Sequence, residues 1–174
     1  TLLSVVTRAR PKIASYPFTT IEPNLGILQL DDGSSSAGLS EVVLADIPGL
    51  IEGASVGKGL GHDFLRHIEN CSALLFVLAL SEEEVFDESL TDLEKAAMLY
   101  DQLVKLRAEL SGHARELLKK PSIVSINKKD LYPSELLTAI RAFFTDKKIE
   151  PIIFSGATQE GLSELKTAIR LQCR

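Results

Sequence analysis

Residues 122–130 read SIVSINKKD, an apolar segment followed at once by a short polar motif. Ser122 to Ile126 has the length and composition of a strand that is buried on both faces of a parallel sheet. In doubly wound α/β folds, ligands bind beyond the carboxyl ends of such strands. The motif Asn127-Lys128-Lys129-Asp130 stands at that place, so this stretch indicates both a fold class and a candidate site.

Apolar and amphipathic segments alternate around this strand. Two further strands are predicted, at Ala73–Leu80 (ALLFVLAL) and at Pro151–Phe154. Helices are predicted over Leu90–Leu118, either as one helix or as two broken near Ser111-Gly112, then from a Ser134 N-cap and over Leu162–Leu171. This alternation predicts an α/β fold with a doubly wound, mostly parallel sheet.

The N-terminal part of the chain has a different pattern. An initial helical pattern ends at Arg10-Pro11, and a loop is expected through about Pro23. Two short segments, Leu25–Leu30 and Glu41–Ala45, predict an antiparallel hairpin at the edge of the sheet, and Asp63–Asn70 predicts a short helix. We therefore expect a single domain with one antiparallel edge strand.

Composition excludes several classes of protein. The 174 residues are 45% hydrophobic and 25% charged, with a formal net charge of −5, so nucleic-acid contacts would need local basic patches. No apolar run approaches the roughly 20 residues that cross a bilayer. Cys71, Cys173 and the three histidines lack metal-ligand spacing, so no metal cluster is expected and a reducing compartment is indicated.

Asp130 is the candidate residue for reading a base. A carboxylate can accept two parallel hydrogen bonds from the N1–H and 2-amino donors of guanine, whereas adenine has no such donor pair. In this interpretation Asn127 ties the loop to neighbouring backbone and the stem of Lys128 lies along the base. The alternative is a solvated turn between a strand and a helix.

Three other segments are candidates for nucleotide contacts. Asp46-Ile47-Pro48-Gly49 follows a strand, so Asp46 could hold Mg²⁺ through a water and Gly49 could approach a phosphate, although a Pro-Gly turn is the simpler alternative. A hydroxyl of Pro17-Phe18-Thr19-Thr20 could complete the Mg²⁺ coordination, or these threonines are only solvated. The backbone N–H groups of Ser155-Gly156-Ala157 could receive the guanine O6. Gly53 to Lys58 resembles a phosphate-binding loop, but the spacing of its glycines is one residue short.

In chain order, Thr20, Asp46–Gly49, Asn127–Asp130 and Ser155–Ala157 reproduce the second to fifth motifs of the Ras-like GTPases. Two stretches, YPFTTIEPNLG and ADIPGLIEGASVGKGLGHDFLRHIE, closely resemble the Obg subfamily of translation-factor-class GTPases. The resemblance extends from Thr1 to Leu171. It implies a Ras-like G domain that binds GTP or GDP with Mg²⁺.

The resemblance also implies a role for each motif residue. Thr20 would bind Mg²⁺ directly and Asp46 would bind it through a water. The residues expected to contact the nucleotide are Phe18, Thr19, Thr20, Ile21, Glu22, Asp46, Ile47, Pro48, Gly49, Asn127, Lys128, Lys129, Asp130, Ser155, Gly156 and Ala157. No catalytic residue is assigned.

Three positions depart from the family pattern. Gly156 stands where the family usually has alanine, and Ala79 stands where relatives often have aspartate. Leu50 occupies the place of the Ras glutamine that orients the attacking water, and leucine cannot hydrogen-bond. Intrinsic GTP hydrolysis is therefore expected to be slow, with a partner supplying the rest of the rate.

By the resemblance, Thr1 would directly follow the P-loop. Residues 1–174 are thus expected to be a partial G domain, with its first strand, its P-loop and the glycine-rich N-terminal Obg domain lying upstream, and this fragment alone is expected to be inactive. The resemblance implies a GTPase that assists assembly of the large ribosomal subunit through rRNA and ribosomal proteins. The alternative is a non-hydrolysing pseudo-GTPase that serves as a ribosome-bound scaffold. Localisation in the mitochondrial matrix is favoured over bacterial cytoplasm or plastid stroma.

Overall fold

The structure, a computed structural model, describes residues 2–6, 12–13, 24–29, 41–46, 71–113 and 115–173. In chain order the elements are α1 (Leu2–Val6), β1 (Lys12–Ile13), β2 (Asn24–Gln29), β3 (Glu41–Asp46), β4 (Leu74–Leu78), α3 (Glu82–Phe86), α4 (Asp92–His113), η1 (Arg115–Lys119), β5 (Ser122–Ile126), η2 (Lys129–Leu131), α5 (Ser134–Asp146), β6 (Ile152–Ile153) and α6 (Leu162–Gln172). The predicted helix at 63–70 and the segment 53–58 lie outside the described residues.

The described strands form two sheets of three strands each. β1, β2 and β3 are antiparallel in that order, with Asn24 opposite Asp46 and Gln29 opposite Glu41. This confirms the antiparallel pairing of the predicted hairpin, which in the described residues forms a sheet of its own and is not bonded to the edge of the parallel sheet. β4, β5 and β6 are parallel in that order, as the buried apolar runs predicted. The α/β class with a parallel sheet and antiparallel strands is therefore confirmed.

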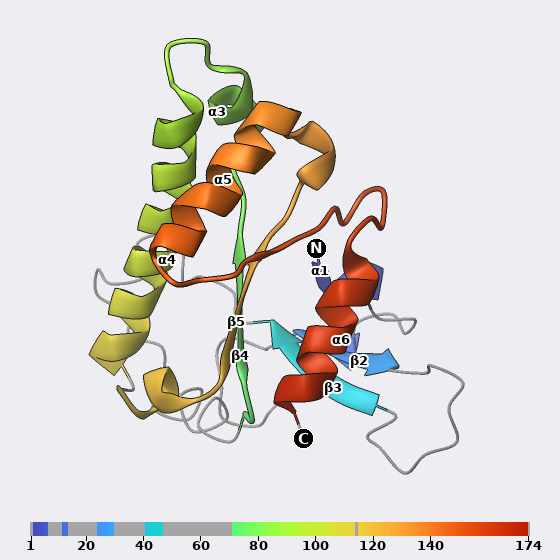
Figure 1. The fold of residues 1–174 in the computed structure, drawn as a ribbon. Coiled ribbons are helices and arrows are strands. Elements are labelled where there is room, and N and C mark those ends of the chain that lie inside the picture. Colours follow the sequence, from blue (N-terminus) through green and yellow to red (C-terminus); the bar gives the residue numbers. More distant parts are fainter. Residues whose placement is uncertain are drawn as a thin grey trace.

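Helices cover both faces of the parallel sheet (Figure 1). On one face, α4 and α5 pack against each other and against the sheet, around Phe76, Ile126 and Phe144. On the other face, Ile123 and Phe154 share a second core with α6 and with Leu28 of β2. This two-sided covering is the doubly wound arrangement, and it explains why β5 reads as a continuous apolar run.

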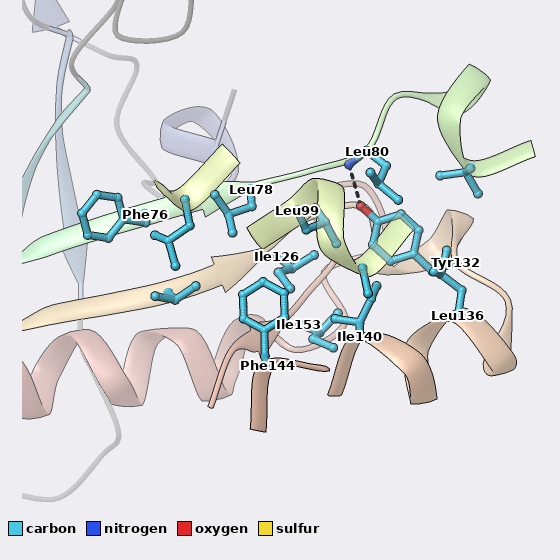
Figure 2. Close-up of a cluster of buried hydrophobic side chains, with 14 of the residues drawn as sticks. Phe76, Leu78, Leu80, Leu99, Ile126, Tyr132, Leu136, Ile140, Phe144 and Ile153 are labelled. Atoms are coloured by element: carbon cyan, nitrogen blue, oxygen red, sulfur yellow. Dashed lines mark hydrogen bonds between the residues drawn. The ribbon is translucent and has the colours of Figure 1, made fainter. Parts of the chain in front are cut away.

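The side chains of β4 alternate between these two cores. Leu74, Phe76 and Leu78 are buried in the α4–α5 core, which Figure 2 shows in close-up, whereas Leu75 and Val77 pack on the α6 side. Ser125 of β5 is fully buried, and its hydroxyl donates to the Phe76 carbonyl at 2.9 Å. That bond satisfies the one polar side chain in the buried part of β5.

Four local predictions need correction. The segment expected to be loop as far as Pro23 contains β1, which adds a third strand to the hairpin. α3 was not predicted, although Ser81 and Glu84 form a capping box in which each side chain accepts the other's backbone N–H. Of the two alternatives for Leu90–Leu118, the structure has two elements, and the boundary between α4, which ends at His113, and η1, which begins at Arg115, lies just after Ser111-Gly112 and not at it.

The fourth correction concerns the start of α5. Pro133, not Ser134, is the N-cap, and its extended backbone turns the chain into the helix without a side-chain bond. Ser134 is the first helical residue, and its hydroxyl donates to Glu135 instead of capping the backbone. Glu135 therefore stays near the positive end of the helix dipole, and hydrogen bonding lowers the pKa of its carboxyl group.

Candidate functional site

The carboxyl ends of β4, β5 and β6 meet at one edge of the parallel sheet, as the strand order requires. We call this edge, comprising residues 79–80, 127–132 and 155–157, the carboxyl edge. Its central loop bonds to both neighbours, because Asn127 N–H donates to the Leu78 carbonyl at 2.8 Å and Lys129 N–H donates to the Phe154 carbonyl at 3.0 Å. The loop that carries Asp130 is thus held between the two adjacent strand ends.

The Asn127 side chain joins two loops that are far apart in the sequence. Its Oδ1 accepts from Lys128 N–H at 2.7 Å and from Gly156 N–H at 2.9 Å. The predicted tie between Asn127 and neighbouring backbone is therefore present, and it brings Asn127–Asp130 together with Ser155–Ala157.

Asp130 lies in a tight turn at the centre of this edge. Lys128 adopts the left-handed conformation (φ 68°, ψ 34°), and Leu131 N–H then bonds to its carbonyl at 2.9 Å. Such a conformation is unfavourable for a residue with a Cβ and persists only where the surrounding bonds hold it. Within the described part of the chain no group donates a hydrogen bond to the exposed Asp130 carboxylate, so that carboxylate can receive donors from a ligand.

The two lysines of the motif are engaged with the protein. Lys128 Nζ donates to the Leu80 carbonyl at 3.1 Å, and Lys129 Nζ forms an ion pair with Glu160. Both contacts hold the loop against its neighbours. Whether the Lys128 stem lies along a base stays a prediction.

The loop after β6 uses all three of its backbone donors internally. Ser155 N–H donates to the Glu160 carbonyl at 2.8 Å and Gly156 N–H donates to Asn127, while Ala157 N–H donates to Ser155 Oγ at 3.1 Å. A carbonyl such as the guanine O6 would therefore have to share or replace one of these bonds. The bond from Ala157 is the longest of the three and is the easiest to exchange.

Gly156 is not required by the backbone conformation of this loop. A Cβ at this position would lie 3.5 Å from Asn127 Oδ1 and 4.0 Å from a methyl carbon of Val5, both ordinary contacts. The structure can therefore accept the alanine that the family usually has there. The contact with Val5 also places α1 beside the carboxyl edge.

The remaining predicted site residues are mostly outside the described part of the chain. Asp46 is described, as the half-buried last residue of β3 opposite Asn24. Phe18–Glu22, Ile47–Gly49 and Leu50 are not among the described residues. Their predicted contacts with phosphate and Mg²⁺ stay predictions.

Three supporting residues escaped the sequence analysis. Tyr132 Oη accepts from Leu80 N–H at 3.0 Å (Figure 2), Gln102 bonds to both backbone groups of Ala79, and Glu160 pairs with Lys129. These partners are 23 to 52 residues apart, so no local pattern could reveal them. Burial raises the pKa of Tyr132 to about 12, which keeps its hydroxyl neutral.

The described residues hold neither a candidate membrane span nor a candidate metal cluster. No described helix has both the length and the apolar character needed to cross a membrane. In the same residues, no three His, Cys, Asp or Glu side chains are grouped so that they could hold a metal ion.

A comparison with protein-family models adds the decisive observation. Residues 1–128 match a family described as "50S ribosome-binding GTPase". The chain belongs to this GTPase family. The match ends two residues short of Asp130, so it covers α1 through β5 and the first two residues of the N-K-x-D motif.

Curated relatives confirm the resemblance of this GTPase-family chain to the Obg group. It is 43% identical over 166 residues to GTPase Obg of Persephonella marina, covering 95% of this chain and 44% of the relative. It is 45% identical over 166 residues to GTPase Obg of Alkaliphilus oremlandii, covering 95% and 35%. The chain thus spans less than half the length of these relatives.

A solved structure confirms the fold. This GTPase-family chain resembles Era, in a crystal structure with MgGDPNP and nucleotides 1506–1542 of 16S ribosomal RNA, with a TM-score of 0.56 and 20% sequence identity. The similarity covers 98% of this chain and 51% of that chain. At this identity the comparison supports the Ras-like architecture and nothing finer.

Proposed function

We propose that this chain is the guanine-reading part of a GTP-binding and GTP-hydrolysing switch protein. The observation that carries the proposal is the exposed Asp130 carboxylate, which lies beyond the end of β5. Asn127 holds the loop of Asp130 by accepting hydrogen bonds from the backbone N–H groups of Lys128 and Gly156. A carboxylate so placed can accept both donors of guanine side by side. The family match and the GTPase Obg relatives support the same reading.

The three segments of the carboxyl edge would divide the work of base recognition. Asp130 would accept from guanine N1–H and the 2-amino group, and Asn127 would hold the two base loops together. Lys128 and Lys129 would brace the turn, and a backbone N–H of Ser155–Ala157 would meet O6. The site fits guanine because no group among the described residues donates to the Asp130 carboxylate, which leaves both of its oxygens available to the two donors of guanine.

Mg²⁺ would bind at the other end of the nucleotide. Asp46 fits this role in chemistry and place, since carboxylate oxygen suits a hard cation and Asp46 ends β3. Thr20 would be the direct ligand, with Phe18–Glu22 and Ile47–Gly49 around the phosphates. When bound, Mg²⁺ supplies positive charge against the β- and γ-phosphate oxygens.

Hydrolysis would be slow and would depend on a partner. Leu50 offers no hydrogen bond to an attacking water, so another group must orient it. We propose the large ribosomal subunit as that partner, with its rRNA and proteins, and the description of the matching family as 50S ribosome-binding supports this choice. The mitochondrial matrix stays a prediction, and the relatives named above are bacterial.

The competing function is a pseudo-GTPase that binds nucleotide without hydrolysing it. Single-turnover release of phosphate from GTP by the complete protein, with and without large ribosomal subunits, separates the two. Release that subunits accelerate supports the switch. No release in either condition, with GTP tightly bound, supports the scaffold.

Guanine recognition is tested by Asp130→Asn in the complete protein. Removing the charge and replacing one acceptor by a donor should weaken GDP binding about 100-fold. It should also improve binding of xanthosine diphosphate, whose 2-oxo group can accept from the new amide. Affinities are measured by calorimetric titration of GDP and of xanthosine diphosphate.

Asp146→Asn is the matched control for this test. Asp146 is an exposed carboxylate at the end of α5, paired with Lys147 at 3.1 Å. Its substitution should leave both affinities unchanged. Unchanged GDP affinity in Asp130→Asn would contradict the proposed function.

A further inference from the structure

Both backbone groups of a single residue, Leu80, are bound by the loop that carries Asp130. Leu80 N–H donates to Tyr132 Oη at 3.0 Å, and Lys128 Nζ donates to the Leu80 carbonyl at 3.1 Å. Lys128 and Tyr132 are two residues before and two residues after Asp130. Both ends of the turn are therefore hydrogen-bonded to the backbone of one residue, Leu80, in the segment that follows β4.

That point is itself held in place. The Gln102 side chain of α4 accepts from Ala79 N–H at 3.3 Å and donates to the Ala79 carbonyl at 3.0 Å. Immediately after Leu80, the capping box of Ser81 begins α3. Leu80 is fully buried, and the residues on both sides of it, Ala79 and Ser81, are held by hydrogen bonds. Its backbone therefore gives the loop that carries Asp130 a fixed position to bind to.

Tyr132 is placed to transmit this rigidity to Asp130. Its side chain is 95% buried in the α4–α5 core beside Leu136 and Ile140, as Figure 2 shows. Its backbone N–H closes the turn by donating to the Lys129 carbonyl at 3.1 Å. The ring and the backbone of one residue thus connect the core to the turn around Asp130.

We propose that Tyr132 is a positioning residue for guanine recognition, which holds the Asp130 carboxylate at the angle needed for two parallel hydrogen bonds. The inference rests on the proposed function of Asp130. A bidentate pair depends on alignment more than a single bond does, because both distances must be satisfied together. If the turn is loosened, one of the two hydrogen bonds between Asp130 and guanine should therefore be lost while the other remains.

The test compares guanosine and inosine diphosphates, since inosine lacks the 2-amino group and makes only one bond to Asp130. Tyr132→Phe in the complete protein removes the acceptor of Leu80 N–H and keeps the ring. We expect GDP affinity to fall about tenfold and inosine diphosphate affinity to fall by clearly less, so that their ratio drops. Both are measured by calorimetric titration.

Tyr100→Phe is the matched control. Tyr100 packs its ring against Phe143 and Phe144 in the same core, and its hydroxyl forms no hydrogen bond with the described residues. This variant should leave the ratio of the two affinities unchanged. If Tyr132→Phe lowers the melting temperature and also leaves the ratio unchanged, the hydroxyl is only structural and the inference is wrong.

A double-mutant cycle separates this inference from the function on which it rests. In an Asp130→Asn background, Tyr132→Phe should cause no further loss of GDP affinity, because the residue through which it acts is gone. Fully additive losses would overturn the inference and leave the proposed function intact. If Asp130→Asn alone has no effect on GDP affinity, the proposed function fails and the inference fails with it.

Discussion

The two sheets that the described residues form carry the two kinds of predicted site residue, and they are packed very differently. β5, which leads to Asp130, has its last four residues buried between two cores. β3, which leads to Asp46, alternates between exposed and half-buried side chains. Its Val43 is 65% exposed and lies opposite Ile27, which is also exposed.

This difference corresponds to the tasks we propose for the two ends of the site. A base reader has to hold one geometry, because selectivity for guanine comes from fixed donors and acceptors. A phosphate sensor has to respond to the presence of a γ-phosphate, which requires a segment that can change its conformation. The parallel sheet supplies the first kind of support, and three predictions test the contrast.

The largest expected effect is in the core between the parallel sheet and α5. Phe144→Ala should lower the free energy of unfolding by about 3–5 kcal/mol, because Phe144 is fully buried and packs on Tyr100 and Phe143. Val43→Ala on β3 should lower it by under about 1 kcal/mol. Urea unfolding followed by circular dichroism measures both, and equal losses would mean that the core over the parallel sheet is packed no more tightly than β3.

The next effect is on alkaline stability at the carboxyl edge. The pKa of Tyr132 is about 12 in the folded chain, above its ordinary value near 10, so the unfolded state releases the proton first. Stability from this group is complete below pH 10 and is lost as the pH rises towards 12, by up to about 3 kcal/mol. Urea unfolding between pH 9 and pH 11 measures this slope.

Tyr132→Phe is the reference for the alkaline prediction. It should lack this part of the pH dependence while keeping the contributions of the other tyrosines and the lysines. The difference between the two slopes isolates Tyr132. Identical slopes in the two proteins would show that the hydroxyl is not buried as described.

The smallest effects come from two glycines in the loop after β6. Gly161 has φ of +78°, and an added Cβ would lie 2.6 Å from the Ile153 carbonyl oxygen, so Gly161→Ala should cost about 1–3 kcal/mol. Gly156 has room for a Cβ, and Gly156→Ala should stabilise the chain by about 0.4–1 kcal/mol through the unfolded state. Midpoints of urea unfolding give both signs, and a destabilising Gly156→Ala would show that this loop is tighter than described.

Much of the fold followed from local patterns. The parallel strands were predicted because their apolar runs have strand length, and α5 and α6 because their apolar residues recur at helical spacing. β1 was missed because two residues are too short for any periodicity, and α3 was missed although its capping box is visible in the sequence. The start of α5 was misplaced by one residue because serine is a preferred N-cap residue, whereas Pro133 occupies the N-cap position through its backbone conformation alone.

The candidate site was predictable in part. The motif Asn127–Asp130 and the loop Ser155–Ala157 were each found from their place after a strand. Their direct contact through Asn127 Oδ1 was expected only in general terms, as a tie to neighbouring backbone. The supports of the loop, Tyr132 and Gln102, left no trace in the sequence because their partners, Leu80 and Ala79, are 52 and 23 residues away along the chain.

The sequence by itself determined which residues we propose to carry the chemistry, because strand length, helical spacing and the N-K-x-D motif are all local properties of the chain. Tertiary structure alone decided what holds those residues still. Leu80 and Tyr132 are 52 residues apart, and only the parallel pairing of β4 with β5 brings a backbone N–H of one within reach of the hydroxyl of the other. The packing of distant segments, and not local preference, sets such a contact.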